Sequence, residues 1–382
     1  MNLRRKCNSL FYLVLLLISC SEKEVSEQDV FLEISERKKF HIGESGITAE
    51  PRYFVSLDSS RSKGVIYNKF AHSLDSIFVS ADSAWIKDGD IMENQGPYGV
   101  GNVLSFFTTD DHIVFMNPQQ FFNQNKLTRE VSMKFMHEFG IFGDTEYLGI
   151  SVPTPSFAHE LYGLDEDSGV GYFIFDDDNQ IRVAGYKASS DSMFFLPVVL
   201  DSEKYFDLRY KVKYKGLIMG GGDEPQLNVV GNKLIISYPS FSDFLVYDLR
   251  SQEQNTFASS SNSFPSQRDL PQNYSDEVDS GELQWELGKL WGEEVRYGYF
   301  TYLGSSDKYI RLVKGGGGRD ASNFIEVFDL EFQKTEEFNL TEMNPDISPD
   351  YLNTKYGLMF RAKDQPDEDV MYYYNINLAD SK

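Results

Sequence analysis

GNKLIISYPSFSDFLVYDLRSQEQNTF, residues 231–257, contains a complete succession of strand, turn, strand, turn and strand. A Gly-Asn turn signal leads into the apolar run 234–238, which has the length of a strand rather than of a helix. The next run, 244–249, is rich in aromatic and branched residues, and a polar turn connects it to residues 254–257. The stretch therefore predicts antiparallel β-structure.

Weaker copies of this unit recur along the chain, at residues 65–79, 110–135, 172–176, 307–330 and 356–376. Three copies end a strand with an aromatic residue, then Asp or Asn, then an aliphatic residue: Tyr247-Asp248-Leu249, Phe328-Asp329-Leu330 and Tyr374-Asn375-Ile376. Repeated antiparallel units that cannot bury their own faces are typical of β-propellers, and six copies leave about 56 residues for each blade. We expect an all-β protein with a six-bladed β-propeller; a non-repeating β-sandwich or two β-domains is the alternative.

The N-terminus has the pattern of an export signal. Arg4, Arg5 and Lys6 precede the apolar run 10–18, which is too short to span a bilayer comfortably. The run leads into Leu-Ile-Ser-Cys at 17–20, which resembles the bacterial lipobox, in which the cysteine becomes the first residue and carries the lipid. The sequence thus predicts a lipoprotein signal peptide at 1–19 and a lipidated Cys20. An ordinary cleaved signal or a membrane anchor is the alternative.

Cysteine usage agrees with this interpretation. The chain has two cysteines, Cys7 and Cys20, so a mature chain that begins at Cys20 can form neither an intramolecular disulfide nor a cysteine metal cluster. The lipobox resemblance implies two or three acyl chains, which hold a membrane far more stably than one.

Residues 20–39 are predicted to be the lipidated cysteine and a tether, followed by the propeller-like domain at 40–382. The polar segment 21–29 resembles, apart from Lys23, the acidic segment that follows the lipid cysteine in surface-displayed lipoproteins of the Bacteroidota. This resemblance implies an outer-membrane location, on the periplasmic face or at the cell surface.

The chain is strongly acidic, with a formal net charge of −23 at pH 7. Removal of the signal peptide would take three positive charges with it. A polyanion would meet repulsion rather than counterion release, so nucleic acid is not expected as a partner.

The segment 258–282 lacks a strand pattern and predicts a long loop, either functional or disordered. Leu283, Leu287 and Leu290 follow at helical spacing and predict a short amphipathic helix. The aromatic residues of this region, Tyr274, Trp285 and Trp291, are the candidate ligand-binding residues; packing within the core or loop is the alternative for the two tryptophans.

Motifs for catalysis and metal binding are weak. His159-Glu160 lacks the second histidine of a zinc protease, and the histidines are scattered singly, so no catalytic residue and no cofactor is assigned. The acidic turns 165–169 and 176–179 carry oxygen ligands suited to Ca²⁺ but depart from the EF-hand spacing. Arg311 alternates with Ile310 and Leu312, and we expect it to be a solvated strand residue rather than a charge in a central channel.

Three short features carry a family resemblance: the Gly-Pro turn in ENQGPYGVG at 93–101, the basic strand Tyr309-Ile310-Arg311, and the Tyr-Asp-Leu strand ending. Together they resemble Bacteroidota lipoproteins of unknown function with predicted six-bladed propellers, in which an acidic-Gly-Pro turn introduces a blade. Gln95 departs from this pattern. The resemblance implies a fold and an envelope location, and it supplies no catalytic residues.

The sequence favours a binding or interaction module of the cell envelope, held at the membrane by its lipid, whose ligand is a glycan, a peptide or an envelope protein. An extracellular hydrolase or lyase acting on polysaccharide is the alternative, and it predicts paired carboxylates in the propeller funnel, one with a strongly raised pKa. A structural subunit would instead present a contiguous apolar patch.

Overall fold

The computed structural model describes residues 30–42, 55–57, 60–117, 120–142, 156–157, 162–175, 180–201, 203, 210–221, 224–317, 321–367 and 370–380. The predicted signal peptide and Cys20 lie outside these residues. Among the described residues, no helix is long and apolar enough to cross a membrane.

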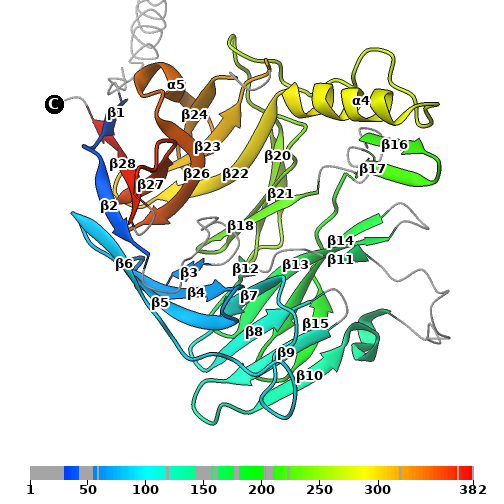
Figure 1. Ribbon diagram of the computed structural model, residues 1–382, viewed down its shortest axis with the longest axis vertical. Helices are drawn as coiled ribbons and strands as arrows, with labels where there is room; N and C mark the ends of the chain where they lie inside the picture. The colour runs from blue at the N-terminus through cyan, green and yellow to red at the C-terminus, as the bar shows by residue number, and fades with distance from the viewer. Residues whose placement is uncertain are drawn as a thin grey trace, which may run out of the picture.

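The described strands form six antiparallel blades arranged in a ring, as the sequence predicts (Figure 1). Blade 1 contains β3 (Val55–Leu57), β4 (Lys63–Asn68), β5 (Ser73–Val79) and β6 (Ser83–Lys87). Blade 2 contains β7 (Ser105–Thr108), β8 (His112–Met116), β9 (Gln120–Asn125) and β10 (Val131–Phe135), followed by the 3₁₀ turns η1 (Met136–Glu138) and η2 (Gly140–Phe142). In blade 3 the first strand is divided into β11 (Ser156–Phe157) and β12 (Tyr162–Gly163), which both pair with β13 (Ser168–Phe175); β14 (Gln180–Lys187) and β15 (Ser192–Phe195) complete it.

Blades 4 to 6 form the second half of the ring. Blade 4, which holds the stretch 231–257, contains β18 (Gln226–Val230), β19 (Lys233–Ser237), β20 (Phe244–Asp248) and β21 (Gln254–Phe257). Blade 5 contains β22 (Arg296–Leu303), β23 (Lys308–Lys314), β24 (Asn323–Phe328) and β25 (Lys334–Asn339), which the short helix α5 (Leu340–Met343) follows. Blade 6 contains β26 (Ile347–Thr354), β27 (Gly357–Ala362), β28 (Val370–Asp380) and, from the other end of the chain, β1 (Val30–Ile34).

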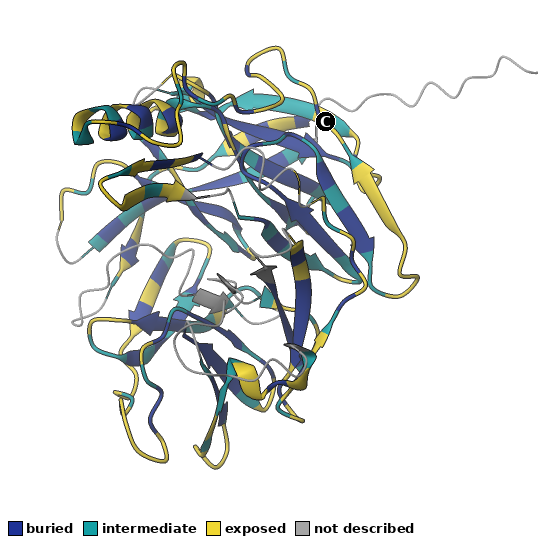
Figure 2. Ribbon diagram, turned by 90° about the vertical axis from the view of Figure 1, so that its right-hand side faces the viewer, coloured by how far each residue is buried: buried dark blue, intermediate teal, exposed yellow. Residues whose placement is uncertain are grey.

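The hydrophobic core is divided among the interfaces between neighbouring blades. In the described part of the chain, six clusters of buried apolar side chains lie between blades 1 and 2, 2 and 3, 3 and 4, 4 and 5, 5 and 6, and 6 and 1. Because blades are covered on both faces, their inner strands bury consecutive residues; all of Asn323–Phe328 is buried. Figure 2 shows this burial along the strands and exposure at the turns. Two-sided burial explains the short continuous apolar runs in the sequence.

The N-terminal strand closes the ring. β1 pairs antiparallel with β28, from Val30 opposite Asp380 to Ile34 opposite Ile376, and thereby becomes the fourth strand of blade 6. The next strand, β2 (Lys38–His41), pairs with β28 and, in parallel, with β6, so it joins blades 6 and 1.

The predicted boundary between tether and domain at residue 40 is therefore too late, because β1 and most of β2 lie within residues 30–39. The sequence signal was weak since β1 alternates between buried and exposed residues at the edge of a blade. Only the part of the predicted tether before Val30 remains outside the described fold.

The repeated aromatic-Asp-aliphatic motif has a structural role in two of its three copies. Asp248 Oδ1 accepts hydrogen bonds from the backbone N–H groups of Arg250 and Ser251, and so begins the turn from β20 into β21. Asp329 begins the corresponding turn in blade 5. Asn375, the third copy, lies inside β28 instead of at a strand end. The difference has a simple cause: blade 6 receives its fourth strand from the N-terminus, so its third strand needs no turn.

An insertion between blades 3 and 4 forms the hairpin of β16 (Tyr210–Tyr214) and β17 (Leu217–Gly221), which packs against helix α4 (Gly281–Glu293) at the periphery of the ring (Figure 1). The helix predicted from the leucine spacing is thus confirmed. Ser280 caps it by accepting a hydrogen bond from the Leu283 N–H, at 3.1 Å. Leu287 is buried, whereas Leu290 is exposed.

The predicted loop before this helix lacks regular strands and is fastened to the blades. Isolated bridges join Gln267 to Phe241 and Glu277 to Lys213. Phe264 packs into a small core with blade 5, and Arg268 is buried. The loop is therefore a packed part of the domain.

Candidate functional site

A cavity of about 400 Å³ lies where hairpin turns of blades 5, 6 and 1 meet. Each turn connects the first and second strands of its blade: β22 to β23, β26 to β27, and β3 to β4. The polar side chains that line this cavity, here called the turn pocket, are Ser60, Arg61, Ser305, Asn353, Thr354 and Lys355.

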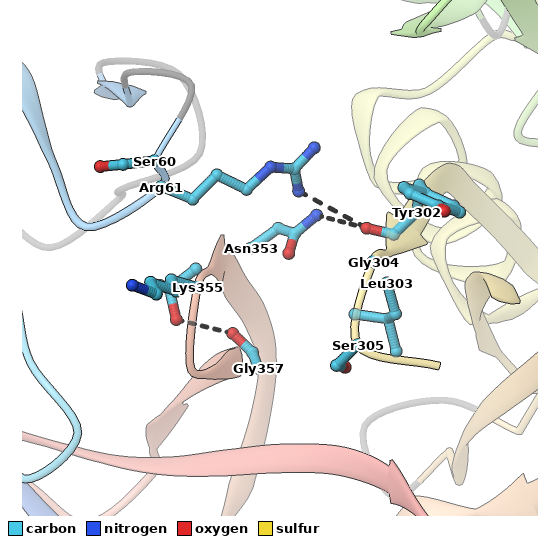
Figure 3. Close-up of a pocket in the computed structure, with 10 residues that line it drawn as sticks. Ser60, Arg61, Tyr302, Leu303, Gly304, Ser305, Asn353, Lys355 and Gly357 are labelled. Carbon is cyan, nitrogen blue, oxygen red and sulfur yellow. Dashed lines mark hydrogen bonds between the residues drawn. The ribbon is translucent and has the colours of Figure 1, made fainter. Parts of the chain in front are cut away.

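Hydrogen bonds between the blades fix the wall of the turn pocket. The carbonyl oxygen of Tyr302, at the end of β22, accepts a hydrogen bond from Asn353 Nδ2 at 3.0 Å and a longer one from Arg61 Nη1 at 3.5 Å (Figure 3). The backbone N–H of Lys355 donates to the carbonyl oxygen of Arg61 at 3.0 Å. Three blades are therefore cross-linked around the cavity, and the Arg61 side chain extends across it toward blade 5.

The turn pocket is positively charged although the protein is acidic. None of the described residues that line it is an Asp or a Glu, and within the described ranges neither Arg61 nor Lys355 forms an ion pair. Burial lowers the pKa of the Arg61 guanidinium, and the neighbouring Tyr302 opposes this in part. An arginine nevertheless stays protonated at neutral pH. The turn pocket thus places two cations without described counter-ions beside one cavity.

Gly357 shapes the β26–β27 turn that borders this cavity. Its φ is +105°, and a Cβ atom there would lie 2.3 Å from Asn377 Oδ1 and 2.6 Å from the Ile376 carbonyl oxygen. We expect Gly357→Ala to lower the free energy of unfolding by about 3 kcal/mol, from backbone strain and the clash together.

Gly216 is the matched control, because its φ is +84° but no atom lies within 4 Å of the place that a Cβ atom would occupy. Strain without a clash predicts a cost of about 1 kcal/mol for Gly216→Ala. Urea unfolding followed by circular dichroism measures both. Equal costs would show that the contact with β28 does not matter.

The three aromatic residues singled out from the sequence lie around α4 and do not line the turn pocket. Tyr274 and Trp291 both contact Tyr210: the rings of Trp291 and Tyr210 stack at 5.6 Å, and those of Tyr274 and Tyr210 lie 5.9 Å apart. Arg268 lies over the Trp291 ring at 3.6 Å. Trp291 is thus a packing residue of the α4 core. Trp285, also on α4, is 70% exposed.

The prediction that Arg311 is solvated is wrong. Its side chain is fully buried between blades 4 and 5. Nε and Nη2 donate to Glu326 Oε2 at 2.9 and 2.7 Å, Nη1 donates to the Ser242 carbonyl oxygen, and Nη2 also donates to Ser259 Oγ. The rings of Tyr297 and Phe300 lie within 5 Å of the guanidinium carbon. Alternation in a strand identifies the face but not what covers it, and here the neighbouring blade covers it.

Glu326 extends this buried contact into a network. Its second oxygen lies 2.9 Å from Lys334 Nζ, and Lys334 also pairs with Glu337. Ser259 and Ser261, at the start of the long loop, donate to Glu326 and Glu337. Burial tends to raise the pKa of Glu337, but hydrogen bonds from Lys334, Ser263 and Ser261 outweigh it, so that the pKa is lowered. The network binds the loop to blade 5 and is a structural feature.

Among the described residues, no group of three or more His, Cys, Asp or Glu side chains could hold a metal ion. In the acidic turn 165–169, Asp167 accepts hydrogen bonds from the backbone and side chain of Ser189. The other acidic turn, 176–179, lies outside the described residues.

The alternative of a carboxylate-based hydrolase predicts an acid with a raised pKa. Every described carboxyl group whose pKa departs clearly from its ordinary value has it lowered, namely Asp167, Asp248, Glu337 and Asp346. No observation on the described part of the chain therefore favours that alternative over binding.

Comparison with known proteins supports the fold. No protein-family model matches the sequence, and no curated protein matches it. Among solved structures, the chain is similar to a member of the DUF4221 family from Bacteroides vulgatus, with a TM-score of 0.64 and 11% identity over 93% of this chain and 100% of that chain. It is also similar to a protein of Bacteroides fragilis described as exported, with a TM-score of 0.50 and 11% identity over 91% of this chain and 95% of the other. At such identity these similarities show the fold alone, and they agree with the resemblance to Bacteroidota propellers.

The turn-pocket residues were missed from the sequence. They belong to three short turns that lie far apart in the chain, and none of the turns matches a binding motif. The turns contain Ser60 and Arg61, Tyr302 to Ser305, and Asn353 to Gly357. The signal in the sequence was their position, because each turn begins just before one of the predicted repeat copies, those at 65–79, 307–330 and 356–376.

Proposed function

We propose that this protein is a lipid-anchored binding module of the cell envelope, and that the turn pocket is its ligand-binding site. The anchor would be Cys20, whose lipobox-like context supports it. The chain between Cys20 and the first strand at Val30 would reach at most about 35 Å, so the propeller would stay close to the membrane surface.

The observation that carries the binding role is the pair of cations, Arg61 and Lys355, in a preformed cavity of about 400 Å³. Cavities of this size are typical of small-molecule sites, and a few polar groups in them fix the ligand's orientation. Cross-links from three blades hold the wall in place, which reduces the ordering cost on binding.

A binding panel tests the ligand site. The mature chain, with Cys20→Ser to prevent lipidation, is immobilised and exposed to neutral and acidic oligosaccharides and short peptides. We expect at least one class to bind, and Arg61→Gln combined with Lys355→Gln to abolish that binding.

The matched control is Arg250→Gln combined with Lys87→Gln, which removes the same charge from two exposed residues away from the turn pocket; it should bind as the parent does. Binding that survives in the pocket variant would place the ligand elsewhere, and a panel with no binder would contradict the proposal. The anchor is tested separately: Cys20→Ala should move the protein from the membrane pellet to the soluble fraction.

A further inference from the structure

The charges of the turn pocket restrict the chemistry of its ligand, on the premise that the proposed binding role is correct. The described residues that line the cavity include two cations and no Asp or Glu, and the chain as a whole carries a formal charge of −23. Arg61 is half-buried and Lys355 is exposed, so a neutral ligand that displaced water from Arg61 would leave its charge without compensation, which costs free energy. An anionic group is therefore the complementary partner.

The geometry of Arg61 favours a planar anion. One guanidinium nitrogen, Nη1, makes a long contact of 3.5 Å with the Tyr302 carbonyl oxygen, and the described residues provide no other hydrogen-bond acceptor for this side chain. The guanidinium is planar and presents its remaining N–H groups as a fork, which matches the two oxygens of a carboxylate. Lys355, on the adjoining turn, adds a second positive charge, and its ammonium group does not require a particular orientation of the anion.

The rest of the lining favours hydroxyl groups over an apolar body. Nδ2 of Asn353 donates a hydrogen bond to the Tyr302 carbonyl oxygen. Figure 3 shows Oδ1 of Asn353 pointing away from this bond, so Oδ1 can accept a hydrogen bond from a ligand hydroxyl. Ser305 adds a hydroxyl, whereas that of Thr354 is engaged with the Gly357 carbonyl oxygen. Among the described lining residues, Leu303 is the one aliphatic side chain. A fatty acid or another apolar acid would find little surface to bury here.

We propose that the turn pocket recognises a sugar acid, a uronic acid residue of monosaccharide to disaccharide size. Its carboxylate lies on the Arg61 fork with Lys355 beside it, and its hydroxyl groups pair with Asn353 and Ser305. Recognition is non-covalent, so the sugar leaves unchanged.

Titration calorimetry and saturation-transfer NMR test this with glucuronic and galacturonic acid against glucose and galactose, and with glucose 6-phosphate as an anion that lacks a carboxylate. We expect the acids to bind at least about tenfold more tightly than the neutral sugars, because a charged hydrogen-bonded contact is worth about ten- to a hundredfold in affinity. Raising the NaCl concentration should weaken the acids selectively.

Variants separate charge from geometry. Arg61→Gln should remove the preference for acids, whereas Arg61→Lys, which keeps the charge and loses the fork, should retain only part of it. Arg250→Gln is the control for an exposed arginine and should change nothing. Thermal unfolding of each variant confirms that it is folded before its affinity is compared.

The outcomes distinguish this inference from the proposed function. Equal affinity for acidic and neutral sugars, or tighter binding of glucose 6-phosphate, would overturn the assignment of a uronic acid while leaving a binding module. If a peptide from the panel binds in the turn pocket and no sugar does, the assignment of a uronic acid is also overturned, while the binding module remains. If no probe of either experiment binds, the proposed function fails together with the inference.

Discussion

Replacing Arg311 by alanine should lower the free energy of unfolding by about 3–5 kcal/mol, the largest effect expected from one substitution in this protein. The guanidinium is fully buried, and it satisfies Glu326 Oε2 twice. Without the guanidinium, this carboxylate oxygen and the Ser242 carbonyl oxygen both lose the hydrogen bonds that Arg311 donates to them in the buried interface. Urea unfolding followed by tryptophan fluorescence and circular dichroism measures the change.

The expected cost arises from the unpaired partner, so it should depend on Glu326. In the double variant Arg311→Met and Glu326→Leu, no charge is left uncompensated at this position, and the aromatic rings of Tyr297 and Phe300 can pack against the methionine. We expect it to be more stable than Arg311→Ala, because buried ion pairs are often replaceable by apolar residues together but not singly. The exposed Arg250→Ala is the control, with a change below about 0.5 kcal/mol. A loss of under about 1 kcal/mol for Arg311→Ala would show that Lys334 alone satisfies the network.

Removing β1 should destabilise the protein by an amount comparable to that of Arg311→Ala or larger. A chain that begins at Ser35 lacks the strand ladder with β28 and the buried side chains of Val30 and Leu32, which belong to the core between blades 5 and 6. Burial of an aliphatic side chain contributes about 1.5–3 kcal/mol, so the loss is on the order of 5 kcal/mol with the ladder included. That is a large share of the stability of an ordinary domain.

Thermal unfolding and size-exclusion chromatography should show a lower Tm and association of the truncated chain, since the exposed edge of β28 would be open to pairing with another molecule. A chain that begins at Val30 is the matched control and should keep the full Tm. A peptide of residues 28–36 added in trans should restore part of the stability, because it can occupy the vacant edge as a strand. An unchanged Tm in the truncated chain would mean that the propeller closes without β1.

Much of the architecture could be read from local patterns. The apolar runs around 234–238 and 308–314 predict strands because each is buried on both faces, and the helix after Ser280 follows from its leucine spacing. The aromatic-Asp-aliphatic ending indicated the repeat, since an aspartate at a strand end can accept the N–H groups of the following turn. These features depend on residues close together in the chain.

Long-range contacts were beyond such patterns. The role of Val30 to Ile34 depends on β28, which lies at the other end of the chain, and the burial of Arg311 depends on Ser242 of the neighbouring blade and on Ser259 of the long loop. The interior position of Asn375 in β28 has the same origin. A strand of a few residues carries too little information to specify which distant segment will cover it.

Contiguous residues were enough to establish the all-β class, the six-fold repeat and the acidic character, and to predict an export signal, because composition, period and local turn chemistry are properties of short segments. The position of the candidate site, in contrast, follows only from the tertiary structure. Arg61 and Lys355 are ordinary turn residues in the sequence, and only closure of the ring brings the turns of blades 1, 5 and 6 to one cavity. The surroundings of these two charges are set by contacts between segments nearly three hundred residues apart, such as the hydrogen bond from the Lys355 N–H to the Arg61 carbonyl oxygen.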